Sequence, residues 1–95
     1  MNYVADIENG KAQLLDVRSK LEWKMGHAKG ATRISVNDVM NGKIDDLDPK
    51  KPVYIYCASG GRAGMAESYL KSKGFQAINI GGINNWVQAG GATER

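Results

Sequence analysis

The chain has 95 residues, which is enough for one domain and too few for two. Its formal net charge is +3, with acidic and basic residues interspersed, so we expect no nucleic-acid-binding surface. No apolar run approaches the roughly 18 residues that span a bilayer, and no basic-then-apolar leader is visible. We therefore expect a cytoplasmic domain with no membrane contact, although a periplasmic chain whose leader had been removed would look the same.

The chain contains a single cysteine, Cys57, and a single histidine, His27. One cysteine excludes an internal disulfide, and the two residues together are too few for a structural metal cage. We therefore expect no metal. Cys57 is then either a buried small hydrophobic residue or a reactive thiol.

The first half of the chain predicts short elements. An apolar run at 13–17 predicts a buried strand, and Ser19 followed by Glu22 has the spacing of a capping box. The helix that this box begins should reach Met25 and end at Gly26. A weak strand over 31–35 and one or two helical turns after it precede a polar loop with two prolines.

The second half has stronger patterns. Residues 53–57, VYIYC, form a continuous β-favouring run that suits a central parallel strand. A helix should begin near Arg62 and end at Gly74, because small or apolar residues recur along one stripe. A strand over 75–80, a glycine turn and a short helix over 83–89 complete the pattern, and residues 89–95 are expected to form a flexible tail.

Strands alternate with helices throughout, which predicts an α/β fold: a parallel sheet with helices on both faces. Sites in such sheets lie at the carboxyl ends of the strands, where Cys57 is placed. The adjacent Gly60 and Gly61 allow a tight loop whose N–H groups converge on one point. The following helix adds unpaired donors and the positive end of its dipole, and Arg62 adds a cation. All of these favour the thiolate, so we expect the pKa of Cys57 to be lowered.

Three motifs together resemble the rhodanese family of sulfurtransferases. The loop CASGGR (57–62) has a cysteine, four residues and an arginine; LLDVRSKLEWKMGHAKGA (14–31) is similar to the amino-terminal motif of the family, and NIGGINNW (79–86) to its carboxyl-terminal motif. They occur in the order and spacing of the family and cover most of residues 13–88.

The resemblance implies a single rhodanese-like three-layer domain over 1–95, with a core of about 10–88. It implies that Cys57 takes a sulfur atom from a small anionic donor such as thiosulfate, becomes a persulfide and passes the sulfur to cyanide or a thiol. The residues expected to hold the persulfide or the donor are the loop Ala58, Ser59, Gly60, Gly61 and Arg62. No cofactor is implied. We expect a monomer, since no long exposed apolar stripe demands a partner.

Other residues carry weaker expectations. His27 is expected to be a structural corner, Asp16 and Arg18 an ion pair, and Trp86 a packing residue that could also wall the pocket. Ala63 stands where relatives often have serine or threonine, and Arg33 where asparagine or histidine is common. These two departures leave the donor preference open.

Two alternative functions compete with turnover on small donors. The domain could be a persulfide carrier that exchanges sulfur with a partner protein of a sulfur relay. A cysteine phosphatase or arsenate reductase is the other alternative, but those loops commonly hold five residues between cysteine and arginine, where this chain has four.

Overall fold

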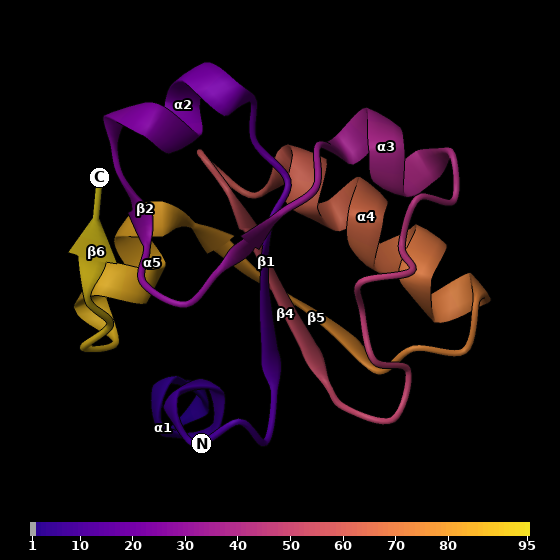
Figure 1. Ribbon diagram of the computed structural model, residues 1–95, viewed down its shortest axis with the longest axis horizontal. Helices are drawn as coiled ribbons and strands as arrows, with labels where there is room; N and C mark the ends of the chain where they lie inside the picture. Colours follow the sequence, from indigo (N-terminus) through magenta and orange to yellow (C-terminus); the bar gives the residue numbers. More distant parts are fainter. Residues whose placement is uncertain (1) are drawn as a thin grey trace.

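The computed structural model describes residues 2–95, which form a four-stranded parallel sheet with helices on both faces (Figure 1). The strands are β1 (Gln13–Asp16), β2 (His27–Ala28), β3 (Thr32–Arg33), β4 (Val53–Cys57), β5 (Ala77–Gly82) and β6 (Thr93–Glu94). The helices are α1 (Tyr3–Glu8), α2 (Lys20–Met25), α3 (Val36–Met40), α4 (Gly61–Ser72) and α5 (Ile83–Gln88). In the described residues no helix is long and apolar enough to cross a membrane.

The sheet has the order β3-β1-β4-β5, and β2 pairs with β6 in a separate antiparallel ribbon. Strand β4 is central and all five of its residues are buried, which confirms the continuous apolar run as an inner parallel strand. Its neighbour β1 is in register over four residues, from Gln13 opposite Val53 to Asp16 opposite Tyr56. All the strands of this sheet are parallel, so β1 and β4 finish at the same edge of the sheet, toward α2 (Figure 1).

Alternation along β4 divides the core into two layers. Val53, Ile55 and Cys57 belong to one buried cluster, which also contains Ala63, Ala66 and Leu70 of α4. Tyr54 and Tyr56 belong to the other cluster, with Val4 of α1 and Trp86 of α5. The predicted arrangement of helices on both faces is thus confirmed, and the thiol is on the α4 side.

The predicted cap of α2 is present. The Ser19 side chain accepts from the Glu22 N–H at 3.2 Å, and the Glu22 carboxylate accepts from the Ser19 N–H at 3.1 Å. The helix ends at Gly26, whose φ of 145° is a value that favours glycine. This helix is short and largely exposed, so its position depends on its ends and on the residues that it reaches toward the loop after β4.

A buried polar network fastens the carboxyl end of β1 to that of β4. Asp16 accepts three bonds from the Arg18 guanidinium, the shortest at 2.8 Å, and one from the Tyr56 hydroxyl at 2.6 Å. Tyr56 in turn accepts from the Ala28 N–H, and Arg18 donates to the Gly26 carbonyl. The expected Asp16–Arg18 pair is therefore confirmed, but it is one part of a brace that includes the residue just before Cys57.

Three features differ from the sequence predictions. Helix α1 was missed, although Asn2 caps it by accepting from the Ala5 N–H and its apolar residues pack on Tyr54 and Trp86. Strand β2 was also missed, because two residues are too few to show a periodicity.

The prediction of a flexible tail over residues 89–95 was wrong at its end. Thr93 and Glu94 form β6 opposite β2, and the Ala92 carbonyl accepts from the indole N–H of Trp86 and from the Lys29 N–H. A β-carbon at Gly91 would lie 2.0 Å from the Trp86 ring. Gly91 is therefore what lets the backbone pass closely over this indole.

Removing the Tyr56 hydroxyl should weaken the fold, because Asp16 would lose a short hydrogen bond inside the protein and Ala28 its acceptor. We expect Tyr56→Phe to lower the free energy of unfolding by about 1–3 kcal/mol, measured by urea denaturation. Tyr69→Phe, in a ring that is only partly buried, is the matched control and should change it by less than about 0.5 kcal/mol. Equal losses in the two variants would show that the brace adds nothing specific.

Candidate active site

Cys57 ends β4 with its sulfur turned toward the loop that follows. The side chain is 1% exposed, and Sγ accepts a hydrogen bond from the Gly60 N–H at 2.9 Å. This bond requires the chain to reverse within three residues. Gly60 makes the reversal with a φ of 107°, a region that side chains with a β-carbon rarely adopt.

The loop and the first turn of α4 surround the sulfur with main-chain donors. Burial raises the pKa of the Cys57 thiol, whereas the N–H groups of Ala63, Ser59, Gly60 and Arg62 lower it, and the net effect is a pKa below the usual value. The 12-residue helix α4 also points the positive end of its dipole at this position. The lowered pKa agrees with the expectation for Cys57.

The structure changes the assignment of individual loop residues. Gly61 is the first residue of α4 and has no positive φ, so only Gly60 makes use of glycine's freedom. Ala63, one residue beyond the predicted loop, contributes a donor, while the Ala58 carbonyl faces Gly82. The sequence could have indicated the donor role of Ala63, because it lies in the first turn of α4 and the first four N–H groups of a helix have no partner within it.

Close backbone packing against β5 holds the loop in shape. A β-carbon at Gly82 would lie 2.3 Å from the Ala58 carbonyl oxygen, and one at Gly60 would lie 3.3 Å from the Gly81 Cα. Gly82 is therefore required for the approach of the loop, whereas Gly81 has a positive φ of 96° and a β-carbon there would meet the Asn85 side chain. The sequence showed them only as a motif.

Asn79 is a functional position that the sequence analysis missed. Its side-chain N–H donates to the Gly60 carbonyl at 2.9 Å, and its side-chain oxygen accepts from the Gly81 N–H at 2.8 Å. Its own N–H donates to Glu67 of α4. Asn79 thus ties the loop, β5 and α4 together; it opens the NIGGINNW motif, but the motif does not show these contacts.

Arg62 is held by a carboxylate from α2. Its Nη1 donates to Glu22 Oε1 at 2.7 Å and its Nη2 to Oε2 at 2.9 Å. The hydrogen bond from Arg62 lowers the pKa of Glu22 to about 2, against partial burial that raises it. The pKa of Arg62 is raised, first by Glu22 and to a smaller extent by the Cys57 thiolate. The guanidinium therefore interacts with both groups, but its two-point contact is with Glu22.

Other candidates from the sequence lie outside the loop. The His27 ring stacks on Trp23 at 3.5 Å, and its Nε2 lies 3.5 Å from Glu94, so it joins α2 to β6 as a structural corner. Trp86 is 1% exposed and belongs to the core on the other face of the sheet from Cys57. In residues 2–95 no group of three histidine, cysteine or carboxylate side chains could hold a metal ion.

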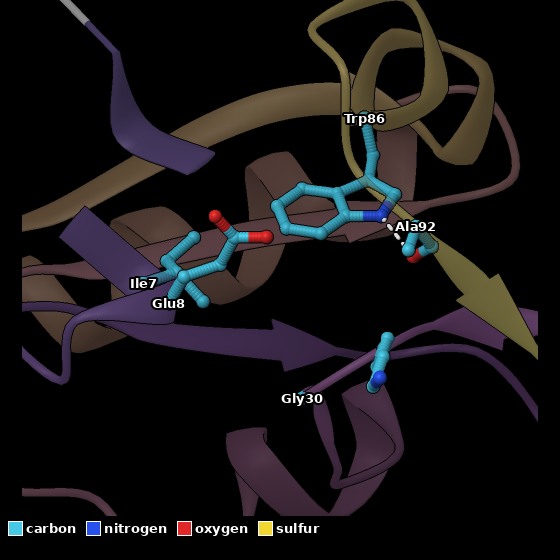
Figure 2. A pocket seen from close by; sticks show the side chains of 6 residues that line it. Ile7, Glu8, Gly30, Trp86 and Ala92 are labelled. Atoms are coloured by element: carbon cyan, nitrogen blue, oxygen red, sulfur yellow. Dashed lines mark hydrogen bonds between the residues drawn. The ribbon is translucent and has the colours of Figure 1, made fainter. Parts of the chain in front are cut away.

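Two surface hollows differ in their relation to the site. One of about 390 Å³ is lined by Arg18 and Glu22 together with Met25, Ile83 and Val87. The other, of about 420 Å³, lies between α1, α5 and the chain around Ala92 (Figure 2). In Figure 2 the Glu8 carboxylate and the Trp86 ring border this second hollow. Neither hollow is lined by residues 57–62, but the first contains Glu22, the partner of Arg62. The hollow at Glu22 is thus the one beside the arginine of the cysteine loop.

The chain belongs to the rhodanese-like domain family, which matches residues 2–89. It is 38% identical over 78 residues to the uncharacterized protein YqhL of Bacillus subtilis strain 168, covering 80% of this chain and 61% of that protein. The chain therefore spans less than two thirds of the length of this curated relative.

Solved structures share the fold. A crystal structure of a protein from Lactobacillus plantarum superimposes with a TM-score of 0.81 at 31% identity, covering 98% of this chain and 82% of that one. A rhodanese-like domain from Anabaena gives a TM-score of 0.78 at 29% identity, covering 88% and 99% of the two chains. The rhodanese-type fold expected from the motifs is confirmed.

If close packing shapes the loop, a methyl group at Gly82 should disturb the thiolate. We expect Gly82→Ala to push the loop away from Cys57 and raise the midpoint of the pH profile of iodoacetamide alkylation by about one pH unit. In the unchanged protein that midpoint should lie below the value near 8.5 of a free cysteine. Gly64→Ala, where the new β-carbon meets only Asn79 at an ordinary 3.5 Å, is the control and should leave the midpoint in place. A midpoint in Gly82→Ala equal to that of the control would contradict this account of the loop.

Proposed function

We propose that the protein is a sulfurtransferase that moves a sulfane sulfur from a donor such as thiosulfate to a thiophilic acceptor through a persulfide on Cys57. The observation that carries the proposal is the hydrogen bond of 2.9 Å from the Gly60 N–H to Sγ, within a ring of four main-chain donors that lowers the pKa of the thiol. Such a ring favours the nucleophilic thiolate over the thiol without a general base.

The reaction proceeds in two displacements at sulfur. In the first, the Cys57 thiolate attacks the outer sulfur of thiosulfate, the S–S bond breaks, and sulfite leaves with the electron pair. In the second, cyanide or a thiolate attacks the terminal sulfur of the persulfide, and the Cys57 thiolate is the leaving group. The same N–H donors face negative charge before and after each step, so they stabilise the thiolate and the persulfide in turn.

The size of the loop favours this chemistry over phosphate or arsenate chemistry. Four residues separate Cys57 from Arg62, and the Gly60 N–H already contacts the cysteine sulfur. A loop closed on Sγ suits one additional sulfur atom. A tetrahedral oxyanion would need donors that converge on a point further from the sulfur.

The acceptor is the less defined half of the reaction. Cyanide and small thiols are the acceptors that the chemistry allows, and a partner protein of a sulfur relay is a further candidate. We place the relay second, since a carrier would accept sulfur only from another protein, whereas the thiolate described above would react with small donors directly.

Mass spectrometry of the intact protein tests the proposal. Incubation with excess thiosulfate or an alkyl persulfide should add about 32 Da, one sulfur atom, and cyanide should remove it. Cys57→Ser should show no adduct under the same conditions. Failure of every small donor to load Cys57, with transfer only from a persulfidated protein, would replace turnover by the carrier function; aryl-phosphate hydrolysis without any adduct would refute the sulfur chemistry.

A further inference from the structure

The cations beside Cys57 are already paired with carboxylates. Arg62, the only cation within the cysteine loop, is held at two points by Glu22. Arg18 is held by Asp16 at 2.8 Å and also donates to a main-chain carbonyl. A donor that carries its own negative charge must compete with these carboxylates for the guanidinium groups.

The remaining arginine at this edge of the sheet, Arg33, does not replace the positive charge that Glu22 and Asp16 neutralise. Arg33 ends β3, its guanidinium donates to the Arg18 carbonyl, and β1 lies between β3 and β4. Two strand spacings separate Arg33 from the strand of Cys57, about 10 Å. The two guanidinium groups of Arg18 and Arg62 are thus each matched by one carboxylate, and neither offers an unpaired positive charge to a second anion.

From this arrangement we propose that Glu22 determines donor specificity: it disfavours the thiosulfate dianion and favours an organic persulfide, which carries no more than one negative charge. The inference rests on the proposed sulfurtransferase function. Thiosulfate can load Cys57, but it finds Arg62 engaged by Glu22. A persulfide brings no sulfonate group and needs no guanidinium for its ground-state binding.

The hollow beside Glu22 offers apolar side chains next to the partner of Arg62, although none of residues 57–62 lines it. Of its lining residues, Met25 is 71% and Val87 50% exposed, and Ile83 adds a third apolar side chain. Exposed apolar side chains around a hollow of about 390 Å³ favour an aliphatic group over a small hydrated anion.

The transfer balances without a further reagent. The Cys57 thiolate attacks the outer sulfur of R–S–SH, the S–S bond of the donor breaks, and R–S⁻ leaves with the electron pair. The new bond joins Cys57 to the outer sulfur, which keeps its proton. No net oxidation occurs, because one sulfane sulfur is exchanged between two thiolates.

Glu22→Gln tests the proposal with little risk to the fold. Glutamine also serves in a capping box, so the bonds with Ser19 at the start of α2 can persist. The change removes one negative charge and frees the Arg62 guanidinium. It should raise kcat/KM for thiosulfate roughly tenfold and for the monoanion methanethiosulfonate roughly threefold, because the interaction with one fixed charge doubles from monoanion to dianion. An alkyl persulfide carries at most one negative charge, so its value should rise no more than that for methanethiosulfonate.

The control is Glu8→Gln, the same substitution at an exposed residue of α1. This helix lies near the start of β1, at the opposite end of that strand from α2 (Figure 1). It should leave all three donors unchanged. Equal changes for the three donors in Glu22→Gln would show a structural role only, and a fall for thiosulfate would mean that Glu22 positions Arg62 for anions; either result overturns the proposal. Failure of all donors to load the unchanged protein would instead refute the sulfurtransferase function itself.

Discussion

The site depends on one short hydrogen bond, from the Gly60 N–H to the Cys57 sulfur. It forms because Gly60 adopts a left-handed conformation, and this reversal places the start of α4 directly over the end of β4. The other main-chain donors then follow from helix geometry, since the first N–H groups of a helix have no partner within it. The pKa of this buried thiol, which an apolar core alone would raise, is thereby lowered below its usual value.

The loop holds this shape because its surroundings leave it little room. Gly82 lies against the Ala58 carbonyl, and Asn79 ties the Gly60 carbonyl to β5. On the other side, the Asp16 network fixes Tyr56, the residue before the thiol. The preorganisation of the donors is therefore a property of three neighbouring strands, although all the donors come from one segment.

Charge adds a second level of control. The motif CASGGR places Arg62 beside the thiol, and from the sequence alone this arginine is a free cation that would attract small anions. The fold brings Glu22 of α2 to the same guanidinium, 40 positions away in the chain, and lowers the pKa of that carboxyl to about 2. The same arginine can therefore support the thiolate while attracting outside anions less than its charge suggests.

Much of the molecule was predictable because its signals are local. The β4 run, the Ser19–Glu22 cap and the Cys57 loop each depend on neighbouring residues, and the alternation of strands and helices specified the α/β class. Helix α1, the pairing of β6 with β2, the role of Asn79 and the Glu22–Arg62 ion pair were not predicted. Each of these four needs contacts that join distant positions or an element too short to show a period.

The sequence by itself determined which thiol is activated and by what kind of loop, since helix start and glycine turn are set within a few residues. Only the tertiary structure decided which carboxylate meets the arginine, because side-chain pairing between separate elements depends on how they pack.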